Sequence, residues 1–121
     1  MRLRRITYMI REHQAVPGCA GCDRLGHTAK VPVAGYTSDA MGLFAVRYAR
    51  RPREPRGWKV DHRPSGHLVV RCATKAEAIV EALRYAGATV DGQPVDWSLS
   101  PAKLRAMRPR MVFPDVHTEA S

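Results

Sequence analysis

The stretch GWKVDHRPSGHLVVRCATKAEAIVEALRYAG, residues 57–87, decides how this chain folds. Trp58, Val60 and His62 alternate with charged residues, and Leu68, Val70 and Cys72 recur at every second position, which is the period of a β-strand. Between the two runs, Pro64 and Gly66 suit a tight turn. The stretch therefore begins with a predicted β-hairpin, and we expect Cys72 on its second strand to be buried in the core.

A helix is predicted over residues 75–86, directly after this hairpin. Thr74 and Glu77 have the spacing of a capping box, in which each side chain accepts a bond from a backbone N–H at the helix start. Gly87 suits the end of the helix. The stripe expected to face inward comprises Ile79, Ala82, Leu83 and Ala86.

The N-terminal half predicts a strand, a loop and a second helix. Residues 3–11 alternate, with apolar positions 6, 8 and 10 on one side and a largely basic other side. Pro32 confines any strand over 30–36 to a sheet edge or a bulge. The segment Thr37–Asp39 offers an N-cap to a helix over 40–51, whose apolar side chains form one stripe.

These elements predict an α+β fold: a small, mostly antiparallel sheet of four to five strands, with two main helices on one face. Thr37–Ala49 aligns with Thr74–Ala86 without gaps, so the chain could consist of two ββα units. A short third helix is expected from Ser100 and Pro101 to about Arg108. We expect a single domain over 1–121, divided as follows: a first half 1–50 containing a Cys/Gly loop at 14–30, a basic connector 51–57, a hairpin–helix part 58–110 and a tail 111–121.

The composition favours a basic protein that resides inside the cell. There are 20 Lys and Arg against 11 Asp and Glu, which gives a formal net charge of +9 over 121 residues. No apolar run is long enough to span a membrane, and the N-terminus lacks the features of a signal peptide. Three cysteines do not form a disulfide framework. We therefore expect a cytoplasmic protein with no membrane partner.

The segment CAGCDRLGHTAKVP, residues 19–32, resembles the CCHC zinc knuckle of single-strand-binding proteins. Cys19, Cys22 and His27 are in register with that motif, whereas Pro32 stands where its fourth ligand belongs. The resemblance implies a zinc ion, and His13 is the expected fourth ligand because structural zinc sites want four. The alternative is a glycine-rich loop with two free thiols.

A second resemblance lies in VDHRPSGHLVVRC, residues 60–72, which is similar to the catalytic hairpin of an HNH nuclease. Asp61 and His62 would then supply the general base. However, His67 stands where Asn is usual, and Cys72 lacks a CxxC partner. A degenerate nuclease is therefore only the third hypothesis for function, and we expect no catalytic residues.

The hairpin and helix of residues 57–87 also resemble small DNA-binding modules, including the arm-type domains of phage integrases, which read DNA with the exposed face of their sheet. Arginine suits phosphate and guanine edges, and basic residues are dense over 47–63. We therefore predict a small nucleic-acid-binding protein, DNA or RNA, of the phage- or plasmid-type regulator class. The alternative is a module or inhibitor that docks on an acidic protein. The expected nucleic-acid contacts are Arg47, Arg50, Arg51, Arg53, Arg56, Lys59, Arg63 and Arg71.

Overall fold

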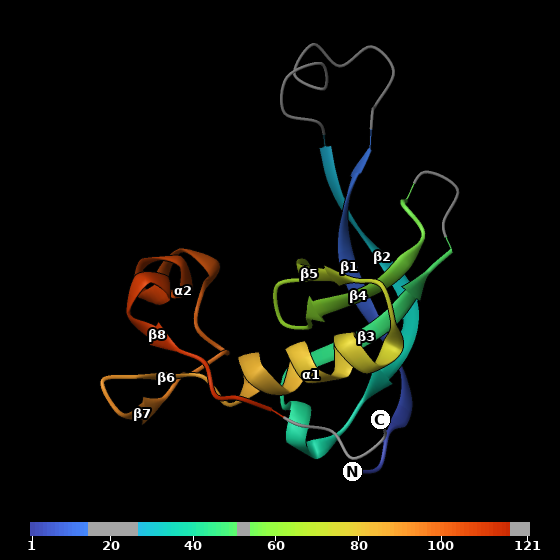
Figure 1. The fold of residues 1–121 in the computed structure, drawn as a ribbon. Coiled ribbons are helices and arrows are strands. Elements are labelled where there is room, and N and C mark those ends of the chain that lie inside the picture. The colour runs from blue at the N-terminus through green and yellow to red at the C-terminus, as the bar shows by residue number, and fades with distance from the viewer. Residues whose placement is uncertain (15–26, 51–53, 117–121) are drawn as a thin grey trace.

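The computed structural model describes residues 1–14, 27–50 and 54–116, which form an α+β fold (Figure 1). Its main sheet is antiparallel, with five strands in the order β1-β2-β3-β4-β5. The strands are β1 (Arg4–Gln14), β2 (His27–Thr37), β3 (Phe44–Ala49), β4 (Gly57–His62) and β5 (His67–Cys72). The predicted fold class is therefore confirmed.

One face of this sheet is covered by helix α1 (Lys75–Ala86), which lies across β3 and β4 (Figure 1). The Thr74 hydroxyl accepts from the Glu77 N–H, as the capping box predicted, while the Glu77 carboxylate accepts from the Ala73 N–H. The core between helix and sheet is built from Met41, Phe44, Val46, Val60, Ala78, Ala82 and Tyr85. Cys72 packs against this core but is only partly buried, so full burial was a wrong expectation.

The opposite face of the sheet is closed by strand β1, because the sheet curls. The Arg11 N–H donates to the Gly66 carbonyl at 2.9 Å, which brings the β4–β5 turn against β1. Tyr8, Ile10 and Ala45 form a second buried cluster inside this curl. The alternation predicted for residues 3–11 is thus confirmed, with Tyr8 and Ile10 facing inward.

The residues after α1 form a small three-stranded sheet and a short helix. Strand β6 (Thr89–Val90) pairs with β7 (Gln93–Pro94) and with β8 (Met111–Val112). Helix α2 (Pro101–Met107) begins with Ser100 as its cap, as expected. Within the described part of the chain, no helix has the length and apolar character needed to cross a membrane.

The helix expected over 40–51 is wrong. Ser38 does cap a helical turn, but this 3-10 turn, η1 (Asp39–Met41), ends at Gly42, whose φ is 59°. The chain then enters strand β3. The first half therefore contains no α-helix among its described residues, and the hypothesis of two ββα units is wrong.

Candidate nucleic-acid interface

Strands β3 and β4 place a network of charged side chains inside the curl. Arg47 and Lys59 are directly opposite each other and only 4% and 3% exposed. The Arg47 Nε donates to Asp61 Oδ2 at 2.6 Å, and the Tyr8 hydroxyl donates to the same oxygen at 2.7 Å. Three strands are thus tied together through one carboxylate.

Glu54 completes this network from the segment between β3 and β4. Its carboxylate accepts two bonds from the Arg47 guanidinium, at 2.7 and 3.0 Å, and a further bond of 2.7 Å from Lys59 Nζ. Two cations and two carboxylates therefore neutralise one another. Glu54 also fastens the described end of the basic connector to the sheet.

The proton affinities of the network follow from burial and from these contacts. Burial alone would raise the pKa of Glu54, but hydrogen bonds and charge from Arg47 and Lys59 lower it to about 2. Burial raises the pKa of Asp61 against the opposing effects of Arg47 and Tyr8. The pKa of Arg47 is lowered by burial, yet its bonds to Glu54 and Asp61 raise it overall. Arg47 therefore stays charged.

Some of the residues expected to contact phosphate are buried in this network, and others are exposed. The expectation that Lys59 is available to nucleic acid on an exposed sheet face is wrong, because Lys59 is buried where β1 closes over that face. Arg63 is half-buried and donates to the Gly42 carbonyl at 2.6 Å. The exposed ones are Arg50, Arg56 and Arg71, while Arg51 and Arg53 lie outside the described residues.

A groove of about 720 Å³ lies where β2 and β3 diverge. The two strands share a single paired position, Tyr36 with Val46, and Gly35 allows the close approach there because a Cβ would lie 2.6 Å from the Val46 oxygen. Pro32 has no N–H to donate, but it breaks no hydrogen bond between β2 and β3, because at Pro32 strand β2 pairs only with β1. The lining consists of Arg5, Pro32, Val33, Ala34, Gly35, Tyr36, Arg47, Tyr48, Arg50 and Trp58.

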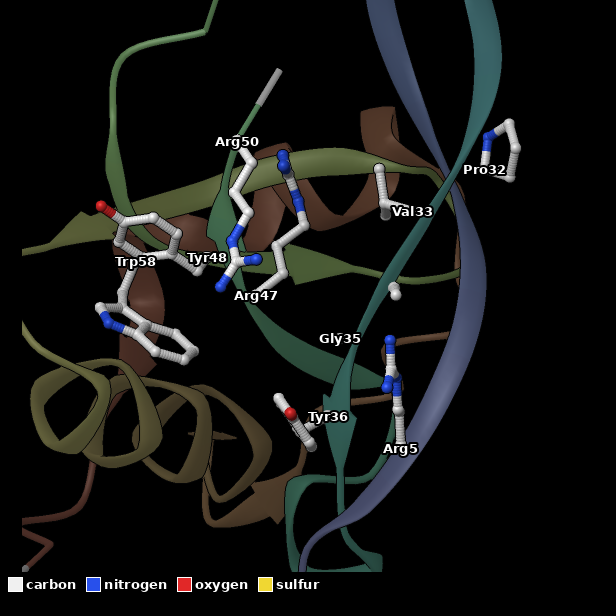
Figure 2. A pocket seen from close by; sticks show the side chains of 10 residues that line it. Arg5, Pro32, Val33, Gly35, Tyr36, Arg47, Tyr48, Arg50 and Trp58 are labelled. Atoms are coloured by element: carbon white, nitrogen blue, oxygen red, sulfur yellow. The ribbon is translucent and has the colours of Figure 1, made fainter.

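The lining combines arginines with aromatic rings, and none of its described residues is acidic. In Figure 2, Arg5 lies on one side of the groove, Arg50 near its middle, and Tyr48 with Trp58 on the far side. Both arginines are exposed, and neither forms an ion pair with the described residues. The sequence does not reveal the aromatic part of this lining, because its pattern predicts Tyr48 on a helix and the rings converge only through strand pairing.

The candidate zinc ligands are only partly within the described residues. Cys19 and Cys22 lie outside them. His13 and His27 are on β1 and β2, where the backbone pairs His13 with Thr28 and Gln14 with His27. Among the residues that the structure describes, no group of three or more His, Cys, Asp or Glu could hold a metal ion.

The Asp61–His62 pair gives the nuclease hypothesis no support. These neighbours on one strand point to opposite faces, and both are buried. The His62 Nδ1 lies 2.8 Å from the Ser65 hydroxyl, and Nε2 lies 2.6 Å from the Trp97 carbonyl oxygen. Both ring nitrogens are thus engaged within the protein.

Comparisons with known proteins leave this geometry as the basis for any functional assignment: no family model, no curated protein and no solved structure matches the chain.

Proposed function

We propose that this protein binds nucleic acid through the groove between β2 and β3. The observation that carries the proposal is the lining itself: the exposed Arg5 and Arg50 share the groove with Tyr48 and Trp58, and none of the described lining residues is acidic. Arginine gives charged, multidentate contacts to phosphate, and aromatic rings offer surfaces on which bases stack. The formal net charge of +9 adds long-range attraction to a polyanion.

The contribution of Arg47 and Lys59 is indirect under this proposal. Their charges are neutralised by Glu54 and Asp61, so they hold β3, β4 and the connector in place. Phosphate contacts are assigned to Arg5 and Arg50, with Arg56 as a further exposed cation on the connector.

The test compares two double variants with the same loss of charge. R5A/R50A removes the groove arginines, and R105A/R110A removes two exposed arginines that are not among the groove lining. Binding to labelled single-stranded and duplex DNA and RNA is measured by fluorescence anisotropy over a range of salt concentrations. Each lost phosphate contact flattens the log–log salt dependence by about 0.7–0.9 units.

We expect R5A/R50A to flatten this slope by roughly 1.5 units and the control pair to leave most of it intact. Equal effects of the two pairs would contradict a groove interface. No binding of the wild type to any of the four nucleic acids at low salt would overturn the proposal and leave docking on an acidic protein as the alternative.

A further inference from the structure

The groove contains an aromatic pair at the margin of the core, in which Trp58 packs against the core while Tyr48 is exposed. Tyr48 on β3 and Trp58 on β4 are directly opposite each other, with ring centroids 5.6 Å apart and planes at 66°. Tyr48 is 40% exposed, whereas Phe44 on β3 and Tyr85 on α1 are buried and pack against Trp97. Exposed aromatic rings at a basic groove are typical of single-strand binding sites.

Two cations lie over the rings of this region rather than beside carboxylates. The Arg50 guanidinium carbon is 5.6 Å from the centre of the Tyr48 ring. The Lys75 Nζ is 4.7 Å from the Tyr36 ring centre and 5.8 Å from that of Trp58. Among the described residues, neither cation forms an ion pair. A phosphate next to a base on these rings would therefore meet an uncompensated positive charge.

The position of the Tyr48 and Trp58 rings favours a single-stranded nucleic acid over a duplex as the ligand of the groove. They line a hollow between two diverging strands and do not project from the surface on a helix or a hairpin tip. In a duplex each base is stacked on its neighbours and paired, so its faces are closed to side chains. An unpaired base has both faces open and can enter such a hollow.

We infer that the groove takes a single strand in preference to a duplex, with a base stacked at Tyr48 and Trp58 and its phosphates against Arg5 and Arg50. The inference rests on the proposed function and narrows its ligand. It assigns affinity to two separable sources: charge, which any strand offers, and base faces, which only an unpaired strand offers.

The experiment uses the wild-type chain of 121 residues and three probes of equal length: oligothymidylate, an abasic strand with the same phosphates, and a duplex. Anisotropy titrations are made at one fixed salt concentration. Tyr48→Ala removes a stacking surface, and Tyr48→Phe is its matched control because it keeps the ring. Thermal unfolding of each variant confirms that it is folded at the temperature of the titration.

We expect oligothymidylate to bind more tightly than both the abasic strand and the duplex. Tyr48→Ala should weaken oligothymidylate binding about 5- to 100-fold, while Tyr48→Phe retains it and binding of the abasic strand is unchanged. The abasic comparison needs no variant, so the inference stays testable even if Tyr48→Ala fails to fold.

The possible failures are distinguishable. Equal affinity for oligothymidylate and the abasic strand, or tighter binding of the duplex, would overturn the single-strand inference while nucleic-acid binding stands. No binding of any probe would overturn the proposed function, and the inference with it.

Discussion

The Tyr8 hydroxyl on β1 donates a 2.7 Å hydrogen bond to Asp61 Oδ2 on β4, across 53 residues of sequence. The two strands are not neighbours in the sheet, so this bond spans the interior of the curl. Burial, and then the charge of Asp61, raise the pKa of Tyr8 far above its usual value. The Tyr8 phenol therefore stays protonated, and it donates one of the hydrogen bonds that the buried Asp61 carboxylate accepts.

Tyr8→Phe tests this bond. It removes a hydrogen bond to a buried carboxylate, which should lower the free energy of unfolding by about 1.5–3 kcal/mol. Tyr48→Phe is the matched control, because Tyr48 is partly exposed and its hydroxyl has no hydrogen bond with the described residues; its effect should stay within about 0.5 kcal/mol. Urea denaturation at neutral pH measures both. Similar values for the two variants would contradict a stabilising role for the Tyr8–Asp61 bond.

Glu54→Gln should destabilise the protein by about 3 kcal/mol, because Arg47 and Lys59 would lose their shared carboxylate. The control is Glu81→Gln, which breaks a more exposed pair with Arg84 and should cost at most about 1 kcal/mol. If Glu54→Gln and Glu81→Gln had the same free energy of unfolding within the error of denaturant titrations, the network would contribute no net stability.

Glu54→Gln should also change how the stability of the protein depends on pH in acid. The pKa of Glu54 is lowered to about 2 from an ordinary 4.5, so the unfolded state binds the proton more readily. The stabilisation from Glu54 is therefore complete above pH 4.5 and is lost as the pH falls toward 2. Glu54→Gln should reduce the loss of stability over this interval. A wild type and variant with parallel stability curves below pH 4.5 would refute the assignment.

His62 should make the fold sensitive to mild acid. Burial lowers the pKa of His62, although the bond to the Trp97 carbonyl opposes this effect. The unfolded chain therefore takes up a proton below pH 6.5 that the folded chain resists, and stability falls as the pH drops, by at most about 1.4 kcal/mol per unit. The pKa of His67 is also lowered, but His67 is exposed whereas His62 is buried. His62→Gln should therefore lessen the slope more than His67→Gln. The measurement is the urea midpoint from pH 7.5 to 5.5.

Gly35→Ala should destabilise the crossing of β2 and β3. The added Cβ would lie 2.6 Å from the Val46 carbonyl oxygen and 3.0 Å from the Tyr8 ring, so backbone has to move. A cost of about 1–3 kcal/mol is expected. Ala34→Ser, at an exposed neighbouring position, should change the melting temperature little. A Gly35→Ala variant as stable as the wild type would show that the strands separate easily here.

The zinc hypothesis predicts stoichiometric zinc in protein purified without a chelator. Cys22→Ser should lower the zinc content, since Cys22 is one of the expected ligands, and Cys72→Ser should not, because Cys72 packs against the core on β5. Elemental analysis of the three proteins decides this. Zinc-free wild type would leave the glycine-rich loop with free thiols.

The hairpin and helix of residues 57–87 could be predicted because every signal there is local. Turn residues, strand period and the capping pair of Thr74 and Glu77 all act within a few positions. The helix predicted over 40–51 is wrong for the opposite reason, because the contacts that decide this segment are not local. Its apolar residues fit a helical stripe as well as a strand, and what makes β3 a strand is its pairing with β4. Gly42, at a positive φ, then ends the helical turn.

The candidate site could be predicted only in its chemical character. A basic segment between residues 47 and 63 was visible in the sequence, but the burial of Arg47 and Lys59 depends on Glu54 and Asp61 meeting them in space. The same limit applies to the groove. Arg5 and Trp58 are more than fifty positions apart, and only the divergence of β2 from β3 places them on one surface.

The closure of β1 over the sheet has a consequence for the order of folding. The hairpin of β4 and β5 and its packing on α1 involve residues close in sequence, so they can form early. The bonds from Tyr8 to Asp61 and from Arg11 to Gly66 close loops of more than fifty residues. We therefore expect β1 to dock late, after the helix has packed. Mutations at Tyr8 would then chiefly accelerate unfolding, and mutations at Ala82 would chiefly slow refolding.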